Sequence, residues 1–104
     1  MTAASQARRG TSVEHWFVYV ARCADGSIYT GIAKDVDARI AAHNAGKGAR
    51  YTKGRGPLVV LATRRCPNKG AALRLELAVK ALSKDQKEQL AGRGRLARFA
   101  RTLV

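Results

Sequence analysis

Acidic residues are scarce in this sequence, where seven Asp and Glu stand against 20 Lys and Arg, a formal net charge of +13. A positive excess of this size is typical of a protein that binds a polyanion, and nucleic acid is the first candidate. An acidic membrane surface is a weaker candidate, because no strongly basic helix with a bulky apolar face is predicted. Charge alone does not separate specific binding, nonspecific binding and catalysis, since all three use attraction to phosphate.

Cysteines and long hydrophobic runs are also scarce. Cys23 and Cys66 are the only cysteines, and they form no CxxC motif. His15 and His43 lie far from both in the sequence, which argues against a zinc centre and predicts two free thiols in a cytoplasmic protein. No apolar run approaches the ~18 residues of a membrane helix, so a membrane-spanning protein is excluded.

The length and hydrophobic content predict one folded domain. The chain has 104 residues, of which 46% are hydrophobic, enough for one modest core. Residues 1–13 lack the apolar stretch of a secretory signal. We therefore expect a disordered basic tail over residues 1–13 and a single domain over residues 14–104.

Two β-prone runs near the N-terminus are joined by a turn signal. Trp16–Cys23 and Ser27–Ala33 are rich in β-branched and aromatic residues. The turn between them contains Asp25-Gly26, which is a strong hairpin signal. A continuous apolar run at Leu58–Thr63 predicts a third strand, and its lack of polar alternation predicts a buried position.

Helical patterns fill most of the remaining chain. Asp35 is typical of an N-cap, and an apolar stripe follows through Val36 and Ile40 until a glycine-rich segment ends the helix. Ser83 and Gln86 have the spacing of a capping box. The order of elements predicts an α/β or α+β sandwich, a small sheet covered by helices. The later helices are expected over Ala71–Leu82, Ser83–Leu90 and Arg95–Leu103.

Two tyrosines lie on the two strands of the predicted hairpin. Tyrosine is common in strands, so either residue alone is explained as a strand aromatic. Tyr29 is followed by Thr30-Gly31, however, and a glycine inside a strand often marks a close approach of a ligand or of the backbone. A phenol takes or passes a proton when a nearby cation lowers its pKa of ~10. Tyr19 and Tyr29 are therefore candidates for proton transfer.

Three charged or titratable residues follow on the predicted helices. Arg39 and His43 are four residues apart and share one helix face. A solvated helix face is one interpretation. In the other, Arg39 stabilises charge on a phosphate, and His43 orients a nucleophile or shuttles a proton. Glu76 is either an i,i+4 partner of Lys80 or the ligand of one Mg²⁺ ion, which often takes only one or two carboxylates.

A glycine-rich basic segment at residues 47–56 is predicted to be a surface loop. Its backbone N–H groups and cations suit phosphates without reading a sequence. Its single aromatic residue would stack on an unpaired base, although a merely solvated loop is the alternative. The candidate nucleic-acid contacts in this loop are Lys47, Arg50, Tyr51, Lys53 and Arg55.

In combination, these residues resemble the GIY-YIG endonuclease domain over about Trp16–Leu90, and most closely its small stand-alone bacterial members. The resemblance is carried by Val18-Tyr19-Val20, Tyr29-Thr30-Gly31, Arg39, His43, Gly46-Lys47-Gly48-Ala49 and Leu75-Glu76.

The resemblance implies a small three-stranded, mainly antiparallel sheet flanked by helices, with one metal site. By matching position, Tyr19 would activate water and Tyr29 would position phosphate or water, although these two roles are open to exchange. Arg39 would stabilise the transition state, and Glu76 would hold one Mg²⁺ or Mn²⁺ ion. His43 stands where the family has His or Tyr.

The resemblance also implies a substrate. Repair-type members of the family have a lysine at the position that Ile32 occupies here. Lys34 would partly replace that missing cation and is also a candidate nucleic-acid contact. We therefore expect a metal-dependent endonuclease acting on DNA, in repair or in processing of single-stranded or branched DNA. One alternative is a nucleic-acid-binding module of the same fold with weak or no activity. Another is a basic ribosome-associated or RNA-binding protein, which gives no reason for the paired tyrosines.

Overall fold

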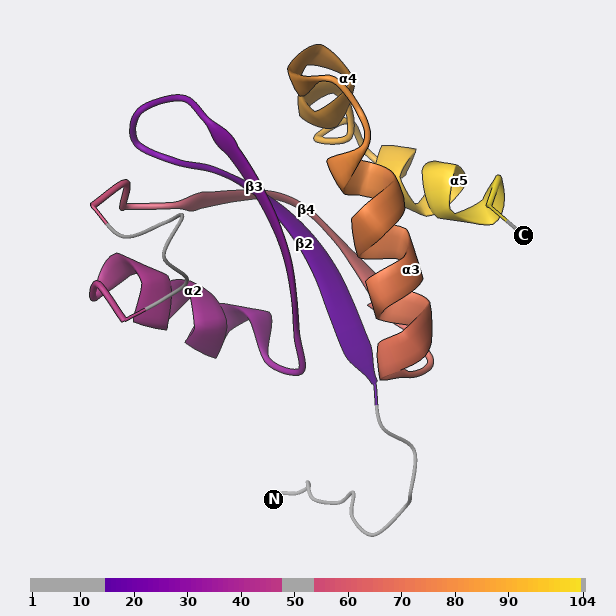
Figure 1. Ribbon diagram of the computed structural model, residues 1–104, viewed down its shortest axis with the longest axis horizontal. Helices are drawn as coiled ribbons and strands as arrows, with labels where there is room; N and C mark the ends of the chain where they lie inside the picture. Colours follow the sequence, from indigo (N-terminus) through magenta and orange to yellow (C-terminus); the bar gives the residue numbers. More distant parts are fainter. Residues whose placement is uncertain (1–14, 48–53, 104) are drawn as a thin grey trace, which may run out of the picture.

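The structure is a computed structural model that describes residues 15–47 and 54–103, and these ranges contain a sheet flanked by helices (Figure 1). The strands run across the middle of Figure 1, and helices lie on both sides of them. The elements are β2 (Trp16–Arg22), β3 (Ile28–Ala33), α2 (Val36–Asn44), β4 (Val59–Cys66), α3 (Lys69–Lys80), α4 (Lys84–Gln89) and α5 (Arg95–Arg101).

The sheet has three strands in the order β3-β2-β4, and both neighbouring pairs are antiparallel. Strand β2 is therefore central. Its Tyr19 lies opposite Gly31 of β3 and opposite Thr63 of β4. This arrangement confirms the predicted small antiparallel sheet with flanking helices, an α+β fold.

The turn between β2 and β3 forms as the sequence predicts. The Asp25 carboxylate accepts hydrogen bonds from the backbone N–H and the hydroxyl of Ser27, at 3.0 and 2.6 Å. Gly26 adopts a φ of 88°, a backbone conformation that glycine reaches without steric cost. The turn sets the register that places the two tyrosines on neighbouring strands.

Side-chain caps define where the helices begin. The Asp35 carboxylate accepts the Ala38 N–H, and Ser83 with Gln86 forms the complete predicted capping box. The sequence analysis missed the cap of α3, where the Asn68 side chain accepts the Ala71 N–H at 2.8 Å. For this reason α3 begins at Lys69 rather than at Ala71. The helix ends at Lys80, two residues before the predicted end at Leu82.

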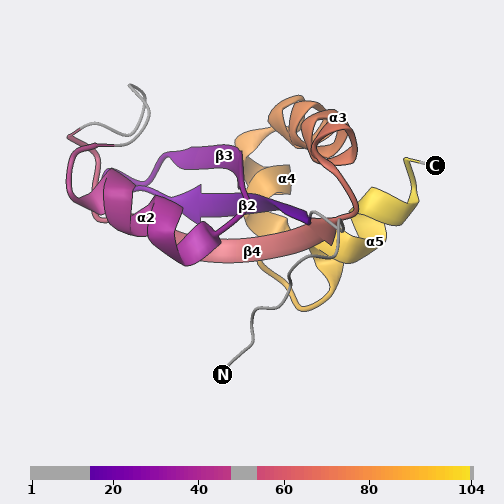
Figure 2. The same ribbon diagram turned by 90° about the horizontal axis from the view of Figure 1, so that it is seen from below.

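The two faces of the sheet are covered by different helices, as the view from below also shows (Figure 2). Because side chains alternate along a strand, β2 contributes to both faces. The tyrosine face contains Tyr19, Ala21, Cys23, Ala33 and Leu58, with Tyr29 and residues of α2 packed beside them. The apolar face contains Val18, Val20, Cys66, Ala72, Leu75, Val79, Leu90 and Leu96.

The third strand corrects one prediction. Its apolar run suggested a buried strand, but β4 lies at an edge of the sheet, where 59% of Val59 and 37% of Val60 are exposed. It also extends to Cys66 rather than ending at Thr63. A continuous apolar run is compatible with burial on both faces, but it does not show whether a strand has one neighbour or two.

One prediction about composition is confirmed by the structure. Cys23 and Cys66 are buried free cysteines. Within the described ranges, no helix has the length and hydropathy needed to cross a membrane.

Candidate active site

The site lies where Gly31 of β3, which has no side chain, faces Tyr19 of β2. Tyr19 and Gly31 are directly paired across β2 and β3. A Cβ atom at Gly31 would lie 2.6 Å from the Tyr19 hydroxyl oxygen and 3.0 Å from a ring carbon of Tyr29. Glycine is therefore required because the two tyrosine side chains occupy the space in which any larger residue would project.

Helix α2 closes the same space with His43. The Tyr19 hydroxyl and the His43 Nε2 atom lie 3.0 Å apart, and both side chains are buried. The ring of Tyr29 lies 6.1 Å from that of Tyr19 and 5.3 Å from that of His43, measured between centroids. Two neighbouring strands and one helix thus bring three rings of the predicted site together.

The electrostatics of Tyr19 differ from the expectation of an acidified phenol. Burial, followed by the charge of Tyr29, raises the pKa of Tyr19 to about 12. The Arg39 guanidinium acts in the predicted direction and lowers this pKa, but desolvation is the larger effect. Tyr19 is therefore a neutral phenol at neutral pH, and it needs a proton acceptor before it accepts a proton itself.

His43 has the properties of that acceptor. Burial, and to a smaller extent the positive charge of Arg39, lowers the pKa of His43 below its ordinary value. The imidazole is therefore neutral at neutral pH. In the tautomer protonated at Nδ1, its Nε2 atom accepts the hydrogen bond that the Tyr19 hydroxyl donates.

Access to this buried pair is limited by its neighbours. Tyr29 and Arg39 are partly exposed, whereas Tyr19 and His43 are almost fully buried. A phosphate approaching from solvent would therefore meet Tyr29 and Arg39 before it reached Tyr19.

Glu76 comes from a different element, α3, whose buried residues pack against the apolar face of the sheet. Its carboxylate is 3.3 Å from the Lys80 ammonium group, which is the i,i+4 pair that the sequence offered as one interpretation. On α3, Ala71 and Ala78 face β4 and α5, where they line a hollow. At 100° per residue, Glu76 lies on the other flank of the helix, the flank toward β3.

The donor set for a metal ion is small. Within residues 15–47 and 54–103 no group of three or more His, Cys, Asp or Glu side chains is arranged to hold an ion. The Glu76 side chain is only 14% exposed. One such carboxylate fits an Mg²⁺ ion that keeps most of its waters and binds substrate phosphate, and it does not fit a fully protein-ligated site.

The predicted nucleic-acid contacts fall into three groups. Lys34 lies 5.4 Å from the ring centroid of Trp16, and Lys47 is exposed after the end of α2. Arg55 forms a 2.6 Å ion pair with Asp25, and its carbonyl accepts the Ala24 N–H, so it joins the loop to the hairpin. The other three, Arg50, Tyr51 and Lys53, lie outside the described residues.

Sequence reasoning missed one residue that shapes the site. The Asn44 side chain accepts the N–H of Leu58 at 2.7 Å. It thereby fixes the end of α2, next to His43, to the start of β4. An asparagine at the end of a predicted helix was the available signal, because its short amide bonds readily to backbone groups.

The comparisons with known proteins identify similar sequences. Residues 15–89 match the GIY-YIG catalytic domain. A UPF0213 protein of Halalkalibacterium halodurans is 54% identical over 74 residues, which cover 71% of this chain and 79% of that protein. A UPF0213 protein of Halobacterium salinarum is 49% identical, over 70% of this chain and 95% of that protein.

A solved structure is also similar. The solution NMR structure of the UPF0213 protein from Bacillus halodurans is 47% identical, covers 80% of this chain and 93% of that chain, and has a TM-score of 0.48. The relatives include bacterial and archaeal proteins. On the strength of the match over residues 15–89, the chain belongs to the GIY-YIG catalytic domain family.

Proposed function

We propose that this chain is an endonuclease that hydrolyses phosphodiester bonds in DNA with the help of one divalent metal ion. The observation that carries the proposal is the 3.0 Å contact between the buried Tyr19 hydroxyl and His43 Nε2, with the ring of Tyr29 beside both. A buried phenol paired with a neutral imidazole is a proton relay, and the arginine beside it suits an anionic substrate.

In the proposed reaction, the Tyr19–His43 pair removes a proton from water. The water gives a proton to the Tyr19 oxygen as its own oxygen attacks phosphorus, and Tyr19 passes its proton to His43 Nε2. The P–O bond to the leaving group then breaks, and the leaving oxygen takes a proton from solvent. This relay accounts for a phenol whose pKa of about 12 prevents it from acting as a preformed phenolate.

Arg39 and Tyr29 would hold the phosphate above the relay. The planar guanidinium stabilises the negative charge that grows on the phosphate oxygens. The Tyr29 hydroxyl orients the phosphate or the water. Glu76 would hold Mg²⁺ or Mn²⁺, and the bound ion would neutralise phosphate charge. Lys34 and Lys47 would contact neighbouring phosphates.

A nicking assay tests the proposal. Supercoiled, single-stranded and branched DNA are each incubated with the protein, with Mg²⁺ and with EDTA. We expect Mg²⁺-dependent cleavage, with Glu76→Ala abolishing it and sparing binding. Glu88→Ala is the matched control, because Glu88 is also a glutamate near a cation, Arg22, at 3.8 Å. Equal activity of the wild type and Glu76→Ala would remove Glu76 as the metal ligand.

A second candidate function rests on two observations of this site. The pKa of Tyr19 is raised rather than lowered, and the Glu76 carboxylate is paired with Lys80. Both favour a module that binds nucleic acid and cleaves it slowly or not at all. The same assay separates the two functions, because a binding module would shift all three DNAs in a gel without nicking any of them.

A further inference from the structure

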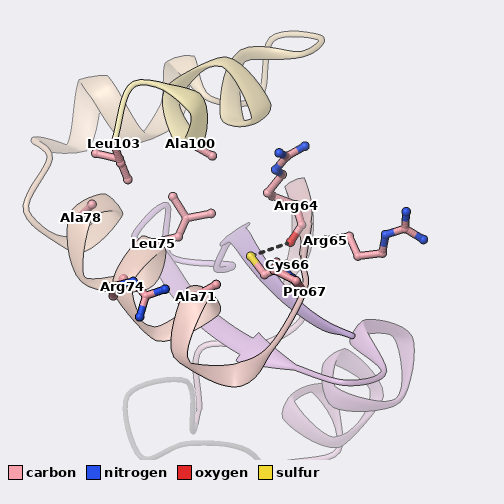
Figure 3. Close-up of a pocket in the computed structure, with 10 residues that line it drawn as sticks. All are labelled: Arg64, Arg65, Cys66, Pro67, Ala71, Arg74, Leu75, Ala78, Ala100 and Leu103. Carbon is pink, nitrogen blue, oxygen red and sulfur yellow. Dashed lines mark hydrogen bonds between the residues drawn. The ribbon is translucent and has the colours of Figure 1, made fainter. Parts of the chain in front are cut away.

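A hollow of about 400 Å³ lies on the apolar face, away from the tyrosine site (Figure 3). It opens between α3, α5 and the end of β4, and its volume is within the range of pockets that bind small ligands. Apolar side chains make most of its wall. The apolar residues that line it are Cys66, Pro67, Ala71, Leu75, Ala78, Ala100 and Leu103.

Arginines stand around this apolar wall. Figure 3 shows Arg64 of β4 and Arg74 of α3 on different sides of the hollow, whereas Arg65 extends away from it. Among the described residues, no ion pair engages these three arginines and no carboxylate side chain lines the hollow. Burial raises the pKa of the Cys66 thiol, so the floor carries no negative charge at neutral pH.

This combination selects a ligand with two parts. The apolar wall accommodates a flat, uncharged ring that leaves water, and two unpaired guanidinium groups attract anionic oxygens at the rim. An unpaired nucleobase and its flanking phosphates have this chemistry. In a duplex the bases are stacked and paired, so only a single strand or an extruded base presents a ring to the hollow.

We propose that the hollow binds an unpaired nucleobase, with Arg64 and Arg74 on the phosphates that flank it. The choice of nucleic acid as the partner rests on the proposed function and on the net charge of +13. The hollow then makes single-stranded nucleic acid the preferred substrate class. It is a second contact region, separate from the phosphate contacts of Arg39 and Tyr29.

The test compares two fluorescein-labelled probes in EDTA, a dT12 oligonucleotide and a 12-mer of abasic nucleotides with the same number of phosphates. Burial of one base against the apolar wall supports a roughly tenfold preference of the wild type for dT12, read by fluorescence anisotropy. Ala78→Leu fills the hollow and should bring the ratio of the two affinities close to one. An unchanged ratio in a variant with the circular dichroism spectrum of the wild type would overturn the proposal.

Charge variants keep the test decisive if Ala78→Leu does not fold. Arg64→Gln with Arg74→Gln should weaken both probes and lower the slope of log affinity against log salt by about 1.4, two contacts at ~0.7 each on a single strand. The matched control, Lys84→Gln with Lys87→Gln, removes the same charge from residues of α4 that do not line the hollow. An equal loss in the control would overturn the assignment of Arg64 and Arg74.

The occupant and the catalytic proposal are tested separately. An acidic peptide of alternating Leu and Glu that binds more tightly than dT12, with Ala78→Leu abolishing its binding, would identify the hollow as a protein-docking site instead. EDTA stops metal-dependent cleavage, so the probes report binding alone. If the protein prefers dT12 but does not cleave DNA in the nicking assay, the nuclease proposal is wrong and the base-binding proposal stands. If it cleaves DNA but shows no preference for dT12, the base-binding proposal is wrong and the nuclease proposal stands.

Discussion

Strand β2 sends its side chains alternately to two faces of the sheet that differ in kind. On the apolar face, Val18 and Val20 are buried against Leu75 and Val79 of α3. On the tyrosine face, the neighbouring residue Tyr19 is equally buried, but its hydroxyl meets the His43 ring. One strand therefore supplies the apolar core and the candidate reactive group at adjacent positions.

The difference shows how a small domain accommodates buried polar atoms. Burial of a polar atom is costly unless it has a hydrogen-bond partner. Tyr19 and His43 satisfy each other, and the missing side chain of Gly31 leaves room for the Tyr19 hydroxyl and for the ring of Tyr29. The apolar face can then supply most of the free energy of folding through burial. This comparison predicts that substitutions on one face affect reaction rates and that substitutions on the other affect stability.

The largest expected effect is that of Tyr19→Phe on cleavage. The substitution keeps the ring and removes the hydroxyl of the proposed relay, so we expect the single-turnover rate to fall by about 10²- to 10⁴-fold, the range for loss of general acid–base catalysis. Affinity for DNA should change little. Tyr29→Phe is the comparison on the same face. A larger loss for Tyr29→Phe than for Tyr19→Phe would exchange the roles of the two tyrosines.

Arg39→Ala should follow, with a loss of about 10²- to 10³-fold in the rate of bound substrate. The proposed interaction strengthens in the transition state, so kcat and kcat/KM should fall together and ground-state affinity should be nearly intact. Arg39→Lys should recover little, because an ammonium group lacks the planar fork. Weaker binding with an unchanged rate for bound DNA would make Arg39 an ordinary phosphate contact.

Leu96→Ala tests the other face and should reverse the pattern. Leu96 is buried in the apolar core and does not line the hollow of Figure 3, and deletion of such a side chain typically costs about 2 to 5 kcal/mol of unfolding free energy. Urea denaturation measures this loss. The single-turnover rate of the folded fraction should stay close to that of the wild type. A rate loss as large as that of Arg39→Ala would show that the two faces are coupled.

Part of the difference between the two faces could be predicted from the sequence. The hairpin signal placed Tyr19 and Tyr29 on paired strands, and the spacing of Arg39 and His43 placed them on one helix face. Burial was harder to predict, because it depends on which elements pack against a strand. The sequence therefore gave no sign that Tyr19 would be so deeply buried that its pKa is raised. Nor did it show that β4 would lie at an edge or that Asn44 would fix α2 to β4.

Alkaline pH should destabilise the folded protein because Tyr19, on the tyrosine face, is a buried phenol. The pKa of Tyr19 is raised to about 12 in the folded protein, above the ~10 of an unfolded chain. Folding therefore favours the protonated phenol. Its contribution to stability is complete below pH 10 and is lost as pH rises from 10 to 12, up to about 3 kcal/mol. Tyr19→Phe should unfold in urea with a smaller loss of stability over this interval.

Thr30→Val gives the smallest expected effect. Among the described residues, Thr30 is the one that buries a side-chain polar atom without a hydrogen-bond partner, and it lies on the apolar face. Thr30 is 3% exposed, and its hydroxyl has no hydrogen-bond partner within the described ranges. Its neighbours in the alternation of β3, Ile28 and Ile32, pack against the apolar core. Valine has nearly the same shape and removes the unsatisfied hydroxyl, so we expect a gain of about 1 kcal/mol in unfolding free energy. Thr30→Ser is the control, because it keeps the hydroxyl and removes a methyl group, and it should destabilise. If Thr30→Val destabilised the protein instead, the hydroxyl would have a partner in solution, and the apolar face would share the polar character of the tyrosine face.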